Sequence, residues 1–242
     1  MTADPAVVSN PRGLGGAVAA VWFDLFGTLV ELGPLAAACE AVAPGRGAAL
    51  AERWRARQLE ATWLRTLMGT WADFETVTRD ALIVAVLELG FDDATATAVA
   101  ATDLVTAFER LPIHPDAMRV AGRLRSAGLR LGILSNGSAG MIERTVARAG
   151  LDGWFELVRT VDAVHRYKPD PAVYALAVEA SRVPESRIGF VTANGWDAAG
   201  AAAFGLRVAW LRPNPGARLP AVAAPPLAIA TWSELPALFG AS

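Results

Sequence analysis

The sequence predicts an α/β protein with a doubly wound, parallel, Rossmann-like sheet and an all-helical cap inserted after the first strand. An apolar run from Ala17 to Phe23 ends abruptly at Asp24, which is typical of a buried strand followed by a turn. Residues 33–110 show helical periodicity and no convincing strand, whereas strand and helix patterns alternate from Pro115 onward. Such alternation is typical of a parallel sheet with helices on both faces.

Length and composition narrow the classes of function. The chain has 242 residues, of which 53% are hydrophobic, enough for one large domain or two smaller ones. The net charge is -2 and no basic run occurs, so we expect no nucleic-acid partner. No apolar run approaches the ~20 residues of a membrane span, and the first residues lack a signal-peptide pattern, so we expect no membrane association. Because Cys39 is the only cysteine, we expect a reducing, cytoplasmic location.

Residues 31–112 predict a helical cap. Its expected helices span residues 48–68, 73–89 and 93–111. The first is rich in strong helix formers, and the second has Asp73 as its N-cap and Gly90 as its stop. Proline and glycine in residues 1–16 predict a loose leader at the start of the chain.

Residues 17–30 and 113–242 are expected to form the core. After the first strand, the expected strands span residues 129–134, 157–160, 188–191, 206–211 and 227–231. The expected helices span residues 116–127, 138–149, 171–181, 197–204 and 233–239. A proline-rich loop begins at Pro213. Since open parallel sheets bind ligands at the carboxyl ends of their strands, polar residues at those ends are the candidate site.

Polar side chains follow three of the expected strands. Asp24 follows the first, residues 135–136 (Ser-Asn) follow the second, and Asn194 with Asp197 follow a later one. Lys168 lies in a loop before a helix. An isolated Asp24 would be interpreted as a turn or helix-cap residue, and Asp197 as the N-cap of the next helix. Together these segments favour a chemical role for Asp24, as a nucleophile, a metal ligand or a base.

The order and spacing of these segments resemble the four motifs of the haloacid dehalogenase superfamily. Residues 24–28 (Asp-Leu-Phe-Gly-Thr) are similar to the aspartate-x-aromatic-glycine-threonine of its L-2-haloacid dehalogenase branch. Residues 54–65, 167–174 and 194–197 resemble other segments of that branch. Members that transfer phosphoryl groups carry a second aspartate where Phe26 stands. The likeness extends roughly from Val21 to the C-terminus.

The resemblance implies a role for each candidate residue. The catalytic set would be Asp24, Thr28, Arg55, Ser135, Lys168, Tyr174, Thr192, Asn194 and Asp197. The substrate-binding set would be Leu25, Phe26, Leu59, Phe74, Asn136 and Trp196. Asp24 would be the nucleophile, Arg55 would accept the departing halide, and Lys168 would balance the charge of Asp24 and keep it ionised.

The resemblance also implies how the substrate is held. Ser135, with the backbone amides of Leu25 and Phe26, would bind the substrate carboxylate near the N-terminus of the following helix. Thr28 would fix the rotamer of Asp24 through a hydrogen bond. The apolar wall around the alkyl group and the halide would consist of Phe26, Leu59, Phe74 and Trp196.

Asp197 and Thr192 would hold Lys168 and the hydrolytic water, and Tyr174 would position that lysine or the substrate. Each assignment has a plainer alternative. Arg55 can be a solvated helix arginine, and Lys168 a surface residue. Tyr174 and the apolar residues can be plain core, which is the usual place of aromatic side chains at helical spacing.

Three positions depart from the branch pattern. Phe26 replaces a tyrosine, Ala56 a glutamine and Thr192 a serine, changes that bear on the range of substrates rather than on the reaction. His114 and His165 lie in expected loops and lack metal-ligand spacing to the cysteine, so we interpret them as non-catalytic.

The resulting hypothesis is a hydrolase that converts short L-2-haloalkanoic acids to D-2-hydroxy acids and halide through a covalent ester on Asp24. It would need no cofactor and no metal ion, and the resemblance implies a homodimer. One alternative is a magnesium-dependent phosphatase of the same superfamily, which Phe26 disfavours because a leaving alkoxide would lack its proton donor. The other is a non-catalytic binding protein, which the set of costly buried charges disfavours.

Overall fold

The computed structural model describes residues 18–100, 102, 104–212 and 227–240. Within this part of the chain, six strands form one sheet in the order β3–β2–β1–β4–β5–β6. The strands are β1 (Ala20–Phe23), β2 (Arg130–Ser135), β3 (Leu157–Thr160), β4 (Ile188–Thr192), β5 (Arg207–Leu211) and β6 (Leu227–Ile229). Every pairing between neighbours is parallel, so the predicted doubly wound α/β class is confirmed.

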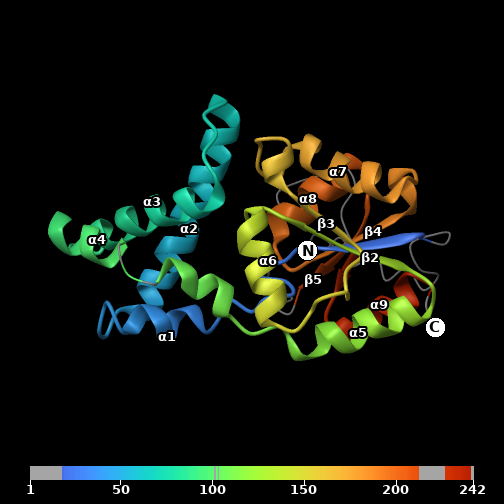
Figure 1. Ribbon diagram of the computed structural model, residues 1–242, viewed down its shortest axis with the longest axis horizontal. Helices are drawn as coiled ribbons and strands as arrows, with labels where there is room; N and C mark the ends of the chain where they lie inside the picture. Colours follow the sequence, from blue (N-terminus) through green and yellow to red (C-terminus); the bar gives the residue numbers. More distant parts are fainter. Residues whose placement is uncertain (1–17, 101, 103, 213–226, 241–242) are drawn as a thin grey trace, which may run out of the picture.

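Helices cover both faces of the sheet. The core helices are α5 (Pro115–Ser126), α6 (Ala139–Arg148), α7 (Pro171–Ser181), α8 (Gly195–Phe204) and α9 (Leu235–Leu238). Short 3-10 turns are η2 (Val161–Ala163), η3 (Glu185–Arg187) and η4 (Trp232–Glu234). In Figure 1, α7 and α8 lie on one side of the sheet, and α5 and α9 lie on the other.

Strand β1 lies inside the sheet, between β2 and β4. Every one of its residues is apolar and buried, as this position requires. Trp22 packs over Gly132 of β2, where an added Cβ would lie 2.6 Å from the indole ring. The Trp22 Nε1 group donates to Ser181 Oγ at 2.8 Å, which satisfies its buried polar atom. This packing fixes the strand whose end carries Asp24.

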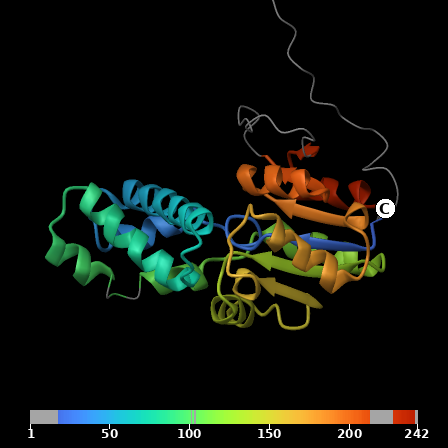
Figure 2. The same cartoon turned by 90° about the horizontal axis from the view of Figure 1, so that it is seen from above.

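A second lobe, built from helices, stands beside the core (Figure 2). It contains α1 (Leu35–Glu40), α2 (Gly47–Met68), α3 (Phe74–Glu88), α4 (Asp93–Ala100) and the 3-10 turn η1 (Val105–Arg110). Asp73 caps α3 as expected, because its Oδ1 accepts from the Thr76 amide at 2.9 Å. Gly90 follows α3 with φ +83, in the left-handed region that favours glycine. The helical cap that the sequence predicts is thus present.

The predicted third cap helix, residues 93–111, is wrong as a single element. Helix α4 ends at Ala100, and the turn η1 begins at Val105. The Thr102 hydroxyl donates to the Val99 carbonyl at 2.6 Å and accepts from the Leu104 amide at 3.2 Å. These bonds replace the helical pattern with a local turn, a known competition for threonine. The sequence reading also missed α1, which is only six residues long.

The C-terminal elements are shorter than predicted. Strand β6 ends at Ile229 rather than Thr231, and the expected helix 233–239 divides into η4 and α9. Glu234 accepts hydrogen bonds from the amides of Ala230 and Thr231, which turns the chain at this point. The leader over residues 1–16 and the loop beginning at Pro213 lie outside the described residues.

The chain enters and leaves the helical lobe through two adjacent segments. Val30 and Ile113 form an antiparallel bridge, and the Glu31 amide donates to the Pro112 carbonyl at 2.9 Å. The domain boundaries that we place at residues 30/31 and 112/113 stay a prediction. Among the described residues, no helix combines the length and the apolar character needed to cross a membrane.

Candidate active site

The candidate residues meet at the carboxyl edge of the sheet. Asp24 follows β1 directly, Ser135 is the last residue of β2, and Thr192 is the last residue of β4. Strand β1 pairs with both β2 and β4, and the crossover connections run in opposite directions from it. This is the switch point at which open parallel sheets form their ligand crevice.

Three side chains hold the buried carboxylate of Asp24. Its Oδ2 accepts from Thr28 Oγ1 at 2.8 Å and from Asn194 Nδ2 at 2.7 Å. Its Oδ1 accepts from Lys168 Nζ at 3.0 Å. The expected contact between Thr28 and Asp24 is therefore present, and Asn194 adds a second donor to the same oxygen.

Lys168 is fully buried between two carboxylates, so its interpretation as a surface lysine is wrong. Its Nζ lies 3.0 Å from Asp24 Oδ1 and 3.0 Å from Asp197 Oδ2. The ammonium also lies 4.9 Å from the centre of the Phe190 ring. Burial acts to lower the pKa of Lys168, but Asp197 and Asp24 outweigh burial and raise this pKa above its ordinary value.

Asp197 is completely buried in the first turn of α8, and Asn194 occupies the N-cap position, so the N-cap interpretation of Asp197 is wrong. Its Oδ1 accepts from the Tyr174 hydroxyl at 2.8 Å. Burial raises the pKa of Asp197 to about 6, Lys168 opposes this rise, and Asp24 adds to it. Tyr174 is both a buried core residue and a hydrogen-bond partner of the site. Burial and Asp197 raise its pKa well above the ordinary value.

Thr192 contacts two of the residues that hold Asp24. Its Oγ1 lies 3.5 Å from the Thr28 hydroxyl and accepts from the Asn194 amide at 3.1 Å. Ser135 is buried, and its Oγ accepts from the Gly137 amide at 3.0 Å. Asn136 Oδ1 accepts from the Lys168 amide at 3.0 Å, whereas Asn136 Nδ2 is buried without an acceptor among the described residues. A buried donor of this kind suits an anionic ligand.

Arg55 approaches the cluster from α2 of the cap. The residue is half-buried, and its Nη1 donates to Gln58 Oε1 at 2.6 Å. Burial lowers the pKa of Arg55 to about 10, while the charges of Asp24 and Asp197 act in the opposite direction. Arg55 is therefore partly withdrawn from solvent and held by Gln58, and the nearby carboxylates favour its charged form.

Aromatic side chains join the cap to this edge of the core. Phe26 stacks on Phe74 of α3 with ring centres 6.4 Å apart, and Trp196 meets Trp63 of α2 at 5.8 Å. Leu59 is half-buried on α2, four residues after Arg55. Leu25 is fully buried next to Asp24. Three of the four predicted wall residues, Phe26, Phe74 and Trp196, thus form ring contacts between the cap and the core.

Comparisons with known proteins agree with this geometry. The sequence matches the family model of haloacid dehalogenase-like hydrolases over residues 18–205, which is most of the chain. The chain belongs to this family. An (S)-2-haloacid dehalogenase of Pseudomonas putida is 41% identical over 197 residues, covering 81% of this chain and 85% of that protein. Haloacetate dehalogenase H-2 of a Moraxella strain is 38% identical over 194 residues, covering 80% of this chain and 85% of that protein.

A solved structure of a relative places the chain within the L-2-haloacid dehalogenase branch of the family. The L-2-haloacid dehalogenase of Xanthobacter autotrophicus, solved with chloropropionic acid covalently bound, is 35% identical to this chain. The two structures superpose over 91% of this chain and 98% of the Xanthobacter chain, with a TM-score of 0.83. The resemblance drawn from the sequence motifs is confirmed.

Two positions in this dehalogenase-like chain escaped the sequence reading. Gln58 is fully buried and connects Arg55 to α3, because its Nε2 donates to Thr78 Oγ1 at 2.6 Å. Tyr167, next to Lys168, donates from its hydroxyl to the Ala72 carbonyl at 2.7 Å, and its amide donates to Thr66 Oγ1 at 2.9 Å. A signal for Gln58 was its spacing of three residues from Arg55 on a helix. Tyr167 had no comparable signal.

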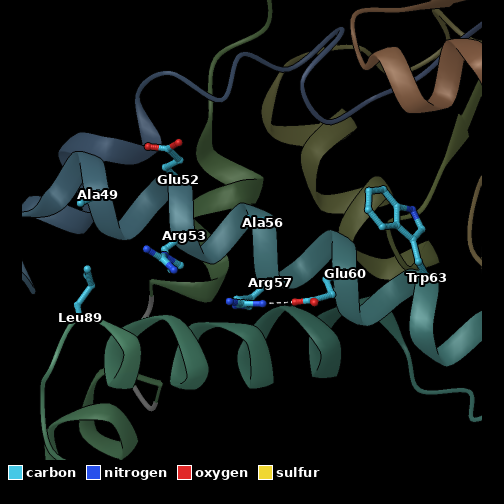
Figure 3. A pocket seen from close by; sticks show the side chains of 8 residues that line it. All are labelled: Ala49, Glu52, Arg53, Ala56, Arg57, Glu60, Trp63 and Leu89. Atoms are coloured by element: carbon cyan, nitrogen blue, oxygen red, sulfur yellow. Dashed lines mark hydrogen bonds and ion pairs between the residues drawn. The ribbon is translucent and has the colours of Figure 1, made fainter. Parts of the chain in front are cut away.

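Ala56 lies on a groove of about 610 Å³ along α2, shown in Figure 3. The groove is lined by Ala49, Glu52, Arg53, Ala56, Arg57, Glu60, Trp63 and Leu89. None of these side chains belongs to the Asp24 cluster, and Ala56 is exposed. The substitution of Ala56 for the family glutamine therefore affects this face of α2 rather than the carboxylate cluster.

The two histidines lie outside the cluster. His114 caps α5 by accepting from the Asp116 amide at 3.1 Å, and His165 packs its exposed ring against Trp71. In the described part of the chain, no three or more His, Cys, Asp or Glu side chains gather in a group able to hold a metal ion.

Proposed function

We propose that this protein hydrolyses short L-2-haloalkanoic acids to D-2-hydroxy acids and halide, with Asp24 as the nucleophile. The observation that carries the proposal is the Asp24 carboxylate, buried, immobilised by Thr28 and Asn194, and paired with the ammonium of Lys168. The named activities of the similar proteins support the same reaction.

The atom positioned for attack is Oδ1 of Asp24. Oδ2 already accepts two hydrogen bonds, whereas Oδ1 accepts only the one from Lys168 in the described part of the chain. An sp² oxygen has two lone pairs, so Oδ1 keeps one for a substrate carbon. Attack on C2 forms the C–O bond of an ester while the C–halogen bond breaks, and the halide leaves with the electron pair.

Cationic and neutral donors fit the two anionic groups of such a substrate. Arg55 would receive the departing halide, since its guanidinium presents several N–H donors in a fixed plane. Ser135 and the unpaired Nδ2 of Asn136 would bind the substrate carboxylate. The aromatic pair of Phe26 and Phe74 would exclude water from the reacting carbon.

Hydrolysis of the ester completes the cycle. Water adds to Cγ of Asp24, the bond from Cγ to the substrate oxygen breaks, and the hydroxy acid leaves with an oxygen that belonged to Asp24. The carboxylate regains one solvent oxygen, and a proton is released. Asp197 would hold Lys168 in place and assist the water together with Thr192.

Phe26 occupies the position at which phosphoryl-transferring members of the superfamily carry an aspartate as proton donor for an alkoxide leaving group. The Phe26 ring packs between Phe74 and Phe108, at 6.4 and 6.1 Å, and carries no acidic group. Chloride and bromide need no such donor because they leave as stable anions. This favours dehalogenation over the phosphatase alternative.

We propose in addition that the enzyme works without a cofactor, in the cytoplasm and as a homodimer. The first point rests on the Lys168 charge, which already lies between the two site carboxylates. The cytoplasmic location is supported by the single, buried Cys39. The homodimer is supported by the resemblance alone.

The test is halide release from L- and D-2-chloropropionate, measured by ion chromatography, with chiral analysis of the lactate formed. We expect release from the L-acid only, D-lactate as product, and the same rate with a chelator present. Asp24→Asn should be inactive. Release that is lost in chelator and restored by magnesium, or hydrolysis of phosphate esters instead, would contradict the proposal.

Oxygen-18 separates ester formation from direct attack by water. In a single turnover in labelled water, with enzyme in excess, the hydroxy acid should contain little label. The peptide that includes Asp24 should carry one labelled oxygen. Label in the hydroxy acid together with an unlabelled Asp24 would show that the carboxylate acts as a base instead.

A further inference from the structure

Arg144, an arginine outside the Asp24 cluster, links the cap to the core. Arg144 belongs to α6, on the core side. Its Nε and Nη2 donate to the two carboxylate oxygens of Glu109 in η1, at 2.8 and 2.7 Å. Nη2 also donates to Glu75 Oε1 in α3, at 2.6 Å. One guanidinium therefore holds two separate segments of the cap.

The burial of Glu109 makes this link strong. Its side chain is 5% exposed, whereas those of Arg144 and Glu75 are 46% and 41% exposed. Bidentate pairs are among the stronger ion pairs, and loss of one partner leaves a buried carboxylate uncompensated. Glu109 and Glu75 accordingly raise the pKa of Arg144 further above its ordinary value. Ser138, the N-cap of α6, donates to the same Glu75 oxygen at 3.1 Å.

The two carboxylates directly follow the two phenylalanines that cover Phe26. Glu75 follows Phe74, and Glu109 follows Phe108. Phe74 stacks on Phe26 at 6.4 Å, and Phe108 meets it edge-on at 6.1 Å. A displacement of either glutamate therefore moves a ring that lies against the residue two positions after the nucleophile.

The same ring cluster reaches the helix that carries Arg55. Trp54 packs edge-on against Phe108 with ring centres 4.9 Å apart, and its Nε1 donates to the Thr78 carbonyl at 2.7 Å. Arg55 is the next residue in the chain. Packed aromatic side chains transmit displacement because protein interiors leave little free volume.

We propose that Arg144 is a positioning residue that sets the place of Arg55 relative to Asp24 by holding Glu75 and Glu109 against α6. The inference rests on the proposed dehalogenation, in which Arg55 receives the halide. Arg144 acts through the Phe74–Phe108–Trp54 contacts and touches neither substrate nor Asp24.

The expected signature is a change in leaving-group discrimination. Bromide departs more readily than chloride and needs less help from a positioned cation. A displaced Arg55 should therefore slow the reaction of 2-chloropropionate more than that of 2-bromopropionate. A general loss of folded enzyme would reduce kcat/KM for both acids by the same factor.

The test compares Arg144→Gln with Arg148→Gln, a matched change on the same helix. Arg148 is exposed and has no ion pair in the described part of the chain. We expect Arg144→Gln to lower kcat/KM for L-2-chloropropionate by about tenfold or more, since small misplacements of catalytic groups are costly. The loss for the bromo acid should be smaller, and Arg148→Gln should match the wild type with both. An equal loss for both acids in Arg144→Gln, or no loss, would overturn the proposal.

A second variant separates the positioning role of Arg144 from a general loss of stability. Glu109→Gln combined with Arg144→Gln removes the buried charge together with its partner, which spares the cost of an unpaired carboxylate. The double variant should regain stability in urea and retain the altered chloride-to-bromide ratio. Return of this ratio to the wild-type value would overturn the positioning role.

Hydrogen exchange provides a readout that does not depend on the proposed activity. Amides of residues 54–60 in α2 should exchange faster in Arg144→Gln than in Arg148→Gln, because the cap loses the ion pairs that hold Glu75 and Glu109 against α6. If the wild type releases no halide, the proposed function fails while this measurement still tests the attachment. Unchanged exchange in an active enzyme would instead overturn only the role of Arg144.

Discussion

Two carboxylates and two cations balance one another around Asp24. Asp24 and Asp197 lie on either side of Lys168. The charges of the same two carboxylates stabilise the charged form of Arg55, which belongs to the cap. Buried charges are tolerated when they are paired and hydrogen-bonded. At the residue scale, the identity and the charge of each partner therefore determine what the site can do.

Arg55 and Arg57 provide a direct test of the halide role, since they lie two residues apart on α2. Arg57 forms ion pairs with Glu60 and Glu88 on the outer face of the cap. We expect Arg55→Lys to lose activity on the order of 100-fold, as when a preorganised donor is removed from an anion site. Arg57→Lys should lose little, because exposed ion pairs contribute little. Steady-state halide release measures both, and equal losses would show that Arg55 has another role.

Asp197 should make the stability of the protein depend on pH. Its pKa of about 6 in the folded protein exceeds the ordinary 3.8, so between these values only the folded state keeps the proton. Stability must then fall as pH rises through this window, and the cost is complete above about pH 6. Asp197→Asn lacks this contribution. The stability of the wild type relative to this variant should decrease from pH 4 to pH 7 in urea titrations, and a constant or increasing difference would contradict the raised pKa.

At the scale of elements, α8 must lie very close to the loop that carries Lys168. Gly200 of α8 faces Pro169 and Tyr174, and an added Cβ would lie 2.4 Å from Pro169 Cβ and 2.7 Å from the Tyr174 hydroxyl. Close approach of this kind requires glycine. The spacing between α8 and this loop keeps Tyr174, Lys168 and Asp197 within hydrogen-bond distance.

Gly200→Ala and Gly122→Ala should have opposite effects on stability. Both glycines lie in helices, but a Cβ at Gly122 would make only an ordinary contact, 3.7 Å from the Trp154 ring. We expect Gly122→Ala to stabilise the protein by up to about 1 kcal/mol through helix propensity. Gly200→Ala should destabilise it by roughly 1–3 kcal/mol through overpacking. Urea unfolding measures both, and similar shifts would refute the close packing of α8.

At the scale of the whole molecule, the buried apolar residues of the cap and of the core form one continuous hydrophobic cluster. Cys39 of α1 is fully buried there, and burial raises the pKa of its thiol to about 11. The thiolate is the reactive form, so both access and ionisation are suppressed. Reaction of the native protein with a thiol reagent therefore requires the cap to open.

We expect the Cys39 thiol to react at least about 100-fold more slowly than an exposed cysteine in the native protein, as for a site that must first unfold locally. The Ala94→Cys variant supplies the comparison within one molecule, because Ala94 is exposed on α4. Its reaction with a chromogenic disulfide should show a fast and a slow phase of equal amplitude. A single fast phase would mean that the cap interior is open to solvent.

The sequence by itself determined the fold class, the family and the position of most elements. Local patterns suffice for this, because hydrophobic periodicity and cap residues such as Asp73 act within a few positions. The helix that carries Arg55 and the polar residues at the strand ends could therefore be predicted. Boundaries failed where a side chain formed bonds that compete with the regular backbone pattern, as at Thr102 and Glu234.

Only the tertiary structure decided which charges are buried and which partners hold them. Lys168 resembles a surface residue until the fold brings Asp24, Asp197 and Phe190 around its ammonium. Asp197 resembles an N-cap until Lys168 and Tyr174 bond to it. Gln58, Tyr167 and Arg144 act through contacts between segments that are distant along the chain. The physical reason is that desolvation and ion pairing depend on distances in space, which hydrophobic periodicity along one chain does not encode.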